Sequence, residues 1–442
     1  RLPWAQLLAP AITLAEQGFR VSPRLHTLLQ ADAHLRKDPL ALRFFYNAQG
    51  QAWPVGHVLR NPEYAHVLRR MAAEGSRALH EGPVAQAMVA RAAQAPRPGA
   101  LSLQDLAGYQ PKEREALCFD HPTPAREVRV CGFPPPSSGQ IAMGQILGLL
   151  AHTQAQGPEL VGGLPSPDFL HRYTEASRLA FADRAQYVAD PDFVSAPAGD
   201  WRSMLAPDYL QKRSQLIGAQ AMKAATAGQP GGQKTSFAPM PSQTEYGTSH
   251  ISIVDGLGNA LAMTTTIESG FGARLMVSVE NLPGGFLLNN QLTDFSFTPQ
   301  DEHGRPVANR VQAGKRPRSS MSPTLVFAEN PSHERGELLV SLGSPGGAMI
   351  IHFTAQTLWA LLHWELDAQQ AINLPHSGVI GANAPLLLES GLFPSATLSN
   401  LQILGHTVKE MDMPSGLQAL QRLGPAWFGA ADPRREGVVA GD

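Results

Sequence analysis

The amino-acid sequence predicts an α+β protein in which helices cover antiparallel sheets. The first half of its 442 residues carries mainly helical patterns, and the second half carries short strand patterns separated by turns. Helices followed by many paired strands favour antiparallel sheets over alternating βαβ units. The length allows about three domains of average size, and it equally allows one large α/β body.

Helical patterns dominate the first half. Apolar residues recur every three or four positions from Trp4, and the pattern stops at Gly18. Serines that precede further helical patterns are expected to act as N-caps: Ser102 before a short helix, the serines of 134–139 before a helix over 140–152, and Ser166 before a longer helix that ends near 190.

Two strand-like runs between these helices carry one cysteine each. Cys118 and Cys131 flank the segment 121–125 symmetrically. If the two runs pair as a hairpin that turns near Pro124 and Ala125, the cysteines face each other. The sequence then allows a cross-strand disulfide in an oxidising compartment, and it equally allows two ordinary buried thiols.

The composition changes around the middle of the chain. Residues 219–247 are rich in Gly, Pro, Ser and Gln, which predicts an exposed, flexible connector. Strand patterns follow at 250–255 and 260–267, joined by a turn. Further strands are expected at 285–289, 324–327 and 338–342, and the last leads through 343–347 into an apolar helix.

Charge and hydropathy exclude several classes of protein. The net charge is −2 and no run of five basic residues occurs, so we expect no nucleic-acid partner. No apolar stretch reaches the roughly 18 residues that a membrane span needs, and no cofactor-binding or metal-binding motif is present. The chain starts with Arg1 and shows no signal peptide, so we expect it to be processed or cut from a longer chain.

The familiar signatures of catalysis are also missing, which leaves the segment around Thr248. The run 231–235 differs from a phosphate loop because Gln233 stands where glycine is needed. A threonine hydroxyl becomes an effective nucleophile when its own α-amine acts as the base, which requires that the preceding peptide bond is cut. Gly247 suits the position before that bond, because glycine tolerates a strained backbone. Gly-Thr before a strand is nevertheless common, so these residues alone are weak support.

Several blocks of sequence together resemble the γ-glutamyltranspeptidases, in the order in which that family has them. The blocks are 248–267 with Phe271-Gly272, 288–295, 315–323 and 343–347, preceded by 134–139, 182–187 and 190–193 and followed by 431–434. The resemblance implies the four-layer αββα fold of two antiparallel sheets that N-terminal-nucleophile hydrolases share. It also implies self-cleavage between Gly247 and Thr248 into a large-subunit part, 1–247, and a small catalytic subunit, 248–442, which form a heterodimer.

The activity that the resemblance implies is γ-glutamyl transfer. The donor would be glutathione or another γ-glutamyl compound, and an acyl-enzyme would pass the γ-glutamyl group to water, an amino acid or a peptide. No cofactor or metal is implied. The resemblance further implies a periplasmic or secreted protein.

Residue roles carry over position by position from the resemblance. The catalytic residues are Thr248 as the nucleophile, Thr266 as its hydrogen-bond partner, and Gly346 and Gly347 as the oxyanion hole. The substrate-binding residues are Ser319 and Ser320 for the α-carboxylate, and Asp294, Gln291 and Glu268 for the α-ammonium. The chemistry fits, because two amides at a helix N-terminus suit a developing oxyanion and a buried ammonium needs a carboxylate nearby.

The chain also departs from the family pattern. Arg1 lies inside what would be the middle of the large subunit, so we expect the arginine that normally clamps the α-carboxylate to be missing from this sequence. The segment 295–314 takes the place of a lid loop and lacks its tyrosine. Two other functions therefore stay open: an amide hydrolase such as a cephalosporin acylase, and a catalytically silent fragment.

Overall fold

A computed structural model describes residues 2–94, 98–232, 234–243, 245, 247–329 and 336–441. The chain forms two compact units, one of residues 1–113 and 267–290 and the other of residues 114–266 and 291–442. The expected cleavage site does not separate these units, because the small subunit predicted at 248–442 contributes to both.

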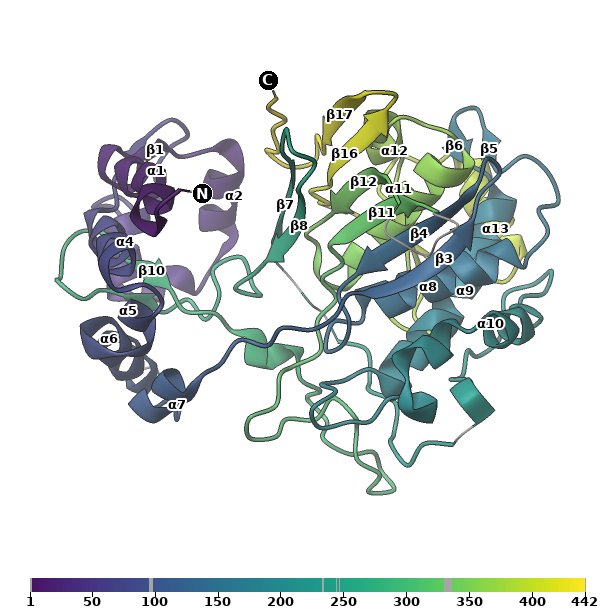
Figure 1. The fold of residues 1–442 in the computed structure, drawn as a ribbon, viewed down its shortest axis with the longest axis horizontal. Helices are drawn as coiled ribbons and strands as arrows, with labels where there is room; N and C mark the ends of the chain where they lie inside the picture. The colour runs from purple at the N-terminus through teal and green to yellow at the C-terminus, as the bar shows by residue number, and fades with distance from the viewer. Residues whose placement is uncertain are drawn as a thin grey trace. The chain divides into compact units, whose positions relative to one another are not determined.

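The first unit is mainly helical (Figure 1). Its elements are α1 (Trp4–Gln17), β1 (Phe19–Arg20), α2 (Pro23–Ala31), η1 (Leu35–Lys37), α3 (Pro39–Phe45), β2 (Val58–Leu59), α4 (Pro62–Glu74), α5 (Arg77–His80), α6 (Gly82–Ala93), α7 (Leu103–Gly108), β9 (Met276–Val277) and β10 (Phe286–Leu287). The predicted end of α1 is confirmed at Gly18, where φ is 92° and a Cβ would lie 2.6 Å from Val58. The predicted N-cap is confirmed at Ser102, which forms a capping box with Asp105.

A buried carboxylate ties the segment 267–290 to the helices of this unit. Glu63 is fully buried at the start of α4, and its carboxylate accepts hydrogen bonds from the N–H groups of Val279, Glu280 and Leu282 at 2.6, 3.1 and 2.8 Å. Burial alone would raise the pKa of Glu63, but these donors hold it below its ordinary value. The charge is therefore satisfied by the loop that it organises.

The second unit is built around a six-stranded antiparallel sheet in the order β17-β16-β12-β11-β4-β3. These strands are β3 (Leu117–Pro122), β4 (Glu127–Gly132), β11 (Thr324–Ala328), β12 (Leu338–Gly343), β16 (Gln418–Leu423) and β17 (Ala426–Ala431). The smaller sheets contain β5 (Leu160–Val161), β6 (Leu164–Pro165), β7 (Ser249–Val254), β8 (Ala260–Thr265), β13 (Ser377–Gly378), β14 (Leu386–Glu389) and β15 (Val408–Met411). The helices are α8 (Gly139–Ala151), α9 (Pro167–Tyr187), α10 (Pro207–Ser214), α11 (Ile350–His363), α12 (Ala368–Asn373) and α13 (Ser395–Ile403), with the 3-10 helices η2 (Pro197–Gly199), η3 (Trp201–Leu205), η4 (Pro230–Gly232), η5 (Gln291–Asp294) and η6 (Gly347–Met349).

The two faces of the large sheet have different partners, as alternation along β12 shows. Val340 and Leu342 are buried in the apolar core that the sheet shares with α8, α9 and α11. Ser341 between them points the other way, and its hydroxyl donates to the carbonyl oxygen of Leu261 at 3.2 Å in the hairpin β7–β8. Helices thus cover one face and a second, antiparallel sheet lies on the other, which confirms the predicted α+β class.

The cysteine hairpin is confirmed in register. Cys118 in β3 pairs directly with Cys131 in β4, and the two sulfur atoms form a disulfide. The sequence alone did not decide between this disulfide and two buried thiols. β3 is the edge strand of the large sheet, so the disulfide fastens the edge to its neighbour.

Two local predictions are wrong. Ser138 stands at the start of α8, but its side chain makes no capping bond and donates instead to the carbonyl oxygen of Ser319 at 2.7 Å. Within the connector 219–247, Ala225, Ala238 and Met240 are buried rather than exposed. The connector does lack strands and α-helices among its described residues, which exclude Gln233, Thr244 and Tyr246. By contrast, Ser166 caps α9 as predicted.

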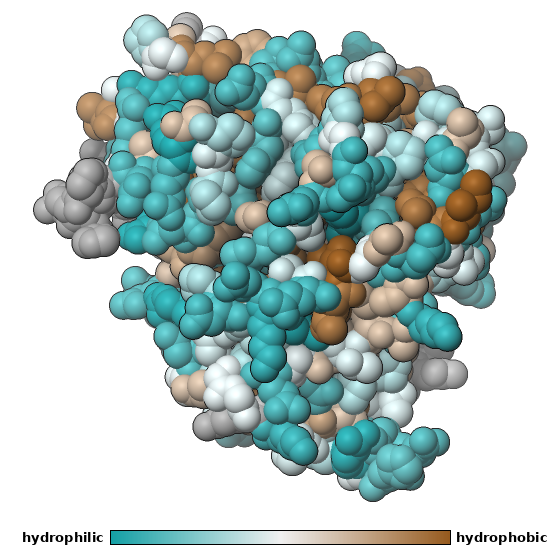
Figure 2. Space-filling model, turned by 90° about the vertical axis from the view of Figure 1, so that its right-hand side faces the viewer, coloured by the Kyte–Doolittle hydropathy of each residue, from teal (hydrophilic) through white to brown (hydrophobic). Residues whose placement is uncertain are grey.

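The described part of the chain contains no helix with both the length and the apolar character to cross a bilayer. The face of the molecule in Figure 2 is mostly hydrophilic, with hydrophobic residues in small separate groups.

Candidate active site

The predicted nucleophile sits at a strained turn immediately before β7. Gly247 has φ of 82° and Thr248 has φ of 89° in the uncleaved chain. Positive φ is easy for glycine but unfavourable for a β-branched residue, and such strain costs about 1–3 kcal/mol. The structure therefore stores strain at Thr248, directly after the Gly247–Thr248 bond.

The carbonyl group of this same bond is held by one of the predicted oxyanion residues. The N–H of Gly346 donates to the carbonyl oxygen of Gly247 at 3.2 Å. Gly346 follows β12 and immediately precedes η6, with φ of 135°, and a Cβ there would lie 2.5 Å from the ring of Phe353. Only glycine fits this position. Gly347 comes next, as the first residue of η6, with φ of 58°.

Thr266 follows β8 directly, as Thr248 precedes β7. The antiparallel register pairs Ser249 with Thr265. Thr248 and Thr266 are the next residues at that end of the hairpin, but Thr248 departs from the extended strand with φ of 89°. The partnership of the two hydroxyls stays a prediction.

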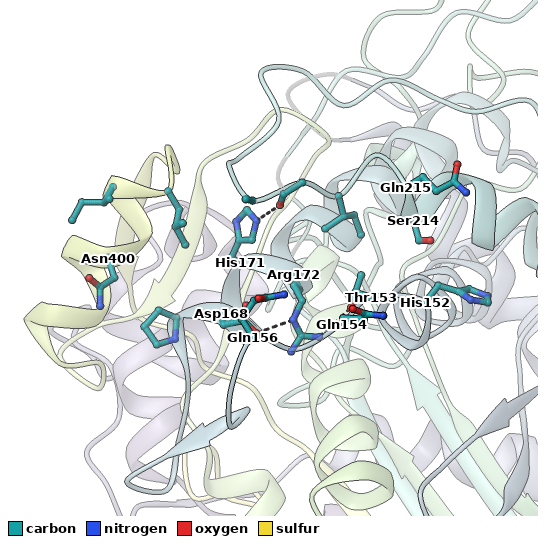
Figure 3. A pocket seen from close by; sticks show the side chains of 16 residues that line it. His152, Thr153, Gln154, Gln156, Asp168, His171, Arg172, Ser214, Gln215 and Asn400 are labelled. Carbon is teal, nitrogen blue, oxygen red and sulfur yellow. Dashed lines mark hydrogen bonds and ion pairs between the residues drawn. The ribbon is translucent and has the colours of Figure 1, made fainter.

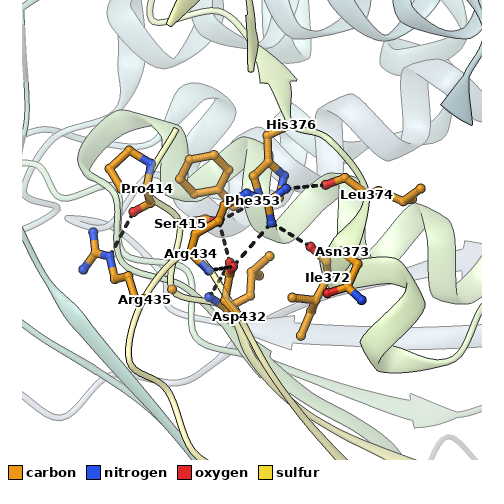
Figure 4. Close-up of polar contacts among 12 residues, drawn as sticks. Phe353, Ile372, Asn373, Leu374, His376, Pro414, Ser415, Asp432, Arg434 and Arg435 are labelled. Atoms are coloured by element: carbon orange, nitrogen blue, oxygen red, sulfur yellow. Dashed lines mark hydrogen bonds and ion pairs between the residues drawn. The ribbon is translucent and has the colours of Figure 1, made fainter. Parts of the chain in front are cut away.

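Arg435 gives the predicted nucleophile, Thr248, a further contact that the sequence did not reveal. Its guanidinium donates to the carbonyl oxygen of Thr248 at 3.2 Å and to the carbonyl oxygen of Pro414 at 2.9 Å. Figure 4 shows the contact with Pro414 next to a buried network in which Asp432 accepts from Ser415 and pairs with Arg434. The closing block 431–434 anchors this network, and Arg435 extends it to Thr248.

The two predicted carboxylate-binding serines lie close to two arginines. The hydroxyl of Ser320 accepts a hydrogen bond from Arg184 of α9 at 2.5 Å. Arg318 precedes the serines in the chain, and its guanidinium donates to the carbonyl oxygen of Arg184 at 3.3 Å. The hydroxyl of Ser319 accepts from the N–H of Met321 at 3.1 Å. Ser320 and both arginines are buried.

The connector supplies the anion at this cluster. The carboxylate of Glu245 lies 3.0 Å from the guanidinium of Arg184 and 4.0 Å from that of Arg318, and it accepts from the hydroxyl of Ser320. Burial alone would raise the pKa of Glu245, but the two arginines and Ser320 hold it below its ordinary value. Burial and the neighbouring charge of Arg184 lower the pKa of Arg318 to about 9, and Glu245 and Asp294 oppose that shift.

Sequence reasoning missed Arg184, Glu245 and Arg318. Arg184 lies inside the block 182–187 and Arg318 inside the block 315–323, but only the serines received a role. The available signal was a charged residue directly before the serine pair. Glu245 gave no such signal, because an acidic residue in a polar connector is ordinary.

The predicted ammonium-binding residues are divided between the units. Gln291 and Asp294 are the ends of η5 in the second unit, where the backbone carbonyl of Asp294 accepts from the side chain of Asn309 at 2.8 Å. Glu268 belongs to the first unit, where its carboxylate is buried and accepts from Ser269 at 2.7 Å and Asn290 at 2.6 Å. The role of Glu268 stays a prediction.

Two cavities differ in their chemistry. A cavity of about 780 Å³ is lined by Arg184, Glu245 and Arg318, together with parts of the connector. A second one, of about 790 Å³, is lined by His171 and by Arg172, which pairs with Asp168 (Figure 3). In the first cavity two arginines share one carboxylate, whereas in the second Arg172 is paired with two carboxylates, those of Asp168 and Glu159. The first borders the cluster that contains Ser320, so it belongs with the candidate site.

The main-chain N–H of Gly346 on the carbonyl before Thr248, within this α+β fold, is the arrangement expected of an N-terminal-nucleophile hydrolase. The solved structure of a cephalosporin acylase from Bacillus halodurans has the same fold, with a TM-score of 0.81, 24% identity, and coverage of 100% of this chain and 74% of that chain. The family model of gamma-glutamyltranspeptidase matches residues 1–442, so the chain belongs to this family.

Curated relatives agree with this assignment. The chain is 31% identical to the glutathione hydrolase proenzyme of Pseudomonas aeruginosa over 457 residues, which cover 99% of this chain and 73% of the relative. It is also 31% identical to the Acylase ACY 1 proenzyme of a Pseudomonas species over 423 residues, 95% of this chain and 68% of the relative. The chain spans 61–73% of the length of the first curated relatives that it matches.

Proposed function

We propose that this protein is a γ-glutamyltransferase and glutathione hydrolase that matures by cutting itself between Gly247 and Thr248. The observation that carries the proposal is the 3.2 Å hydrogen bond from the N–H of Gly346 to the carbonyl oxygen of Gly247. This contact supports the proposal, because a main-chain donor on that oxygen would stabilise the oxyanion formed when the threonine hydroxyl of the next residue attacks.

The proposed cleavage is an acyl shift within one peptide group. The hydroxyl oxygen of Thr248 attacks the carbonyl carbon of Gly247, and the N–H of Gly346 stabilises the resulting oxyanion. The C–N bond then breaks as its nitrogen takes the proton that the hydroxyl gives up, and an ester links Gly247 to Thr248. Water hydrolyses the ester, which leaves a carboxylate on Gly247 and a free α-amine on Thr248. Loss of the positive-φ strain at Thr248 favours the forward direction.

The proposed turnover reuses these groups. The α-amine of Thr248 takes the proton from its own hydroxyl, the hydroxyl oxygen attacks the γ-carbonyl carbon of the donor, and the amine product leaves with a proton. Water or an amino group of the acceptor then attacks the acyl-enzyme ester and frees Thr248. We assign Gly346 and Gly347 to the oxyanion and Thr266 to the orientation of the nucleophile.

Recognition of the donor is assigned to hydroxyl donors for its carboxylate, and to two carboxylates and an amide for its ammonium. Ser319 and Ser320 are proposed to bind the α-carboxylate, and Asp294, Gln291 and Glu268 the α-ammonium. Each charge of an amino-acid end needs such a partner once it leaves water.

The two proposed subunits, 1–247 and 248–442, are expected to stay together as a heterodimer. Strands β3 and β4 come from the first and β11, β12, β16 and β17 from the second, and all six form one sheet. The disulfide between Cys118 and Cys131 supports a periplasmic or secreted location, because such bonds persist in oxidising compartments.

Mass measurement of the purified chain on a denaturing gel, with sequencing of the new N-terminus, tests the proposal. Two fragments that begin at residues 1 and 248 are expected, and Thr248→Ala should give one intact chain. The mature protein should hydrolyse γ-glutamyl-p-nitroanilide. A small fragment that begins elsewhere contradicts the cleavage site, and hydrolysis of glutaryl-p-nitroanilide alone would favour the acylase function.

A further inference from the structure

We infer that Arg184, Arg318 and Ser320 form the carboxylate subsite for the donor, and that Glu245 occupies this subsite until a donor carboxylate displaces it. The inference rests on the proposed function, and it assigns to two internal arginines the positive charge that hydroxyl groups alone cannot supply. It also gives the end of the connector a role as an internal competitor.

The contacts of Glu245 are those of a bound carboxylate ligand. One oxygen pairs with Arg184 at 3.0 Å and lies 4.0 Å from Arg318, and the other accepts from the hydroxyl of Ser320. Guanidinium groups and hydroxyls that converge on one carboxylate are the usual means of recognising that group. The subsite is therefore already built in the uncleaved chain.

The cost of burial shows why the subsite needs an anion. The side chains of Arg184 and Arg318 are 5% and 4% exposed. Two buried cations side by side are costly without a counter-charge. The Nε of Arg318 is buried and has no hydrogen-bond partner among the described residues. When Glu245 leaves, an incoming carboxylate restores the charge balance.

The position of Glu245 in the chain puts the subsite near the nucleophile. It lies three positions before Thr248, so their Cα atoms are at most about 11 Å apart. Once the bond after Gly247 is cut, Glu245 lies two residues from a free chain end. It can then leave, and the adjoining cavity of about 780 Å³ offers space for a ligand.

The need to displace Glu245 should weaken the apparent affinity for the donor by a measurable factor. If Glu245 holds the subsite for most of the time, the apparent affinity for a carboxylate ligand falls by the fraction of sites that are open. Replacing the carboxylate by a neutral amide removes the competitor but keeps the size of the side chain. Arg184 and Arg318 then remain as unpaired cations that favour an external anion.

Binding of L-glutamate to the full 1–442 chain tests this inference without any need for turnover. The background is Thr248→Ala, which keeps the connector in place. We expect isothermal titration to show that the added substitution Glu245→Gln tightens binding of L-glutamate at least about tenfold. Adding Arg318→Leu to that protein should abolish the gain. Glu337→Gln is the matched control, because Glu337 pairs with Arg422 on the surface of the same unit, and it should change nothing.

Thermal unfolding keeps the test decisive if Glu245→Gln weakens the fold. L-glutamate should then raise the melting temperature of Thr248→Ala/Glu245→Gln more than that of Thr248→Ala. Equal binding and equal thermal shifts in the two proteins would overturn the inference. Failure of self-cleavage in the wild-type chain would count against the proposed function and would leave this binding result unaffected. Binding of glutarate as tight as that of L-glutamate supports the carboxylate subsite and points to the acylase function.

Discussion

The guanidinium of Arg435 donates a hydrogen bond to the carbonyl oxygen of Thr248 across 3.2 Å. A residue close to the end of the described chain thereby holds the first residue of the proposed small subunit. Its second bond, to Pro414 at 2.9 Å, fixes the guanidinium itself (Figure 4). The peptide after the proposed cleavage site is thus oriented by a residue outside the hairpin β7–β8.

We predict that Arg435→Met slows self-cleavage by about tenfold or more. A hydrogen bond from a charged donor is worth about 1.5–3 kcal/mol, and about 1.4 kcal/mol corresponds to tenfold in rate. The measurement is the rate at which the intact chain disappears on a denaturing gel. Arg422→Met is the control, because Arg422 pairs only with surface Glu337 among the ion pairs of the described residues. Equal rates for both variants would show that the contact with Thr248 is not used.

Gly346→Ala should slow both cleavage and turnover. The new methyl group would meet the ring of Phe353 at 2.5 Å, and alanine tolerates φ of 135° poorly, so the N–H must move away from Gly247. Removal of one oxyanion donor costs other enzymes about 10²–10³ in kcat, and we expect about 10² for this displacement. Gly391→Ala is the matched control, since Gly391 also has positive φ (69°) but has nothing within 4 Å of its Cβ position. If Gly346→Ala cleaves and turns over at wild-type rates, Gly346 serves only to form the turn.

Loss of the disulfide should lower stability without changing the register of its hairpin. The bond joins residues 13 positions apart, and closing a loop of about 15 residues contributes about 3 kcal/mol in the chain-entropy model. We predict that Cys118→Ser/Cys131→Ser loses up to about 3 kcal/mol in the free energy of unfolding by urea. Dithiothreitol should weaken the wild type similarly. It should have no effect on the double variant, because the chain has only two cysteines.

Acid should destabilise the protein between about pH 6.5 and pH 4. Burial lowers the pKa of His352 to about 4 and that of His121 to about 3, whereas an unfolded histidine titrates near 6.5. Between these values the unfolded chain binds protons that the folded chain does not, so stability falls as the pH falls. Each group contributes at most about 1.4 kcal/mol per pH unit. Urea unfolding at pH 7 and pH 5 measures the loss.

His363 offers a variant for this pH dependence. Its Nε2 lies 2.8 Å from that of His121, and burial lowers its pKa to about 4. His363→Gln should therefore reduce the loss of stability between pH 7 and pH 5. His303→Gln should leave it unchanged, because His303 is exposed. A free energy of unfolding that is flat over this range would contradict the assignment.

Local patterns predicted the elements that carry the nucleophile. The short turn between 250–255 and 260–267 predicted the pairing of β7 with β8, and the register follows because each residue has one partner. The symmetric spacing of the cysteines predicted their pairing in the same way. Gly346 was recognisable as glycine at the start of a helix, although its clash with Phe353 was not.

Contacts between distant segments escaped prediction. Ser138 has the residue type and position of an N-cap. Its hydroxyl instead donates a hydrogen bond to the carbonyl oxygen of Ser319, which is 181 residues away in the sequence. Arg184, Glu245 and Arg318 come from a helix, a connector and a loop, and their charges matter only because folding buries them together. No local periodicity records such a cluster. The Gly-rich and Pro-rich composition of the connector predicted exposure, which is correct for many of its positions. It gave no sign that the carboxylate of Glu245 is buried against Arg184 and Arg318.

Asp294 provides the test of substrate class. A γ-glutamyl donor carries an α-ammonium, and a glutaryl donor of nearly the same shape does not. If Asp294 binds the ammonium, Asp294→Ala leaves that charge without its partner, which costs more than the loss of a contact to a neutral group. We predict that Asp294→Ala lowers kcat/KM for γ-glutamyl-p-nitroanilide by 10²-fold or more, on the order of 3 kcal/mol, and lowers it far less for glutaryl-p-nitroanilide. Asp301→Ala is the control, because Asp301 pairs with Arg305 within its own turn. Equal losses on both donors would make Asp294 structural, since its backbone already binds Asn309, and would favour an acylase.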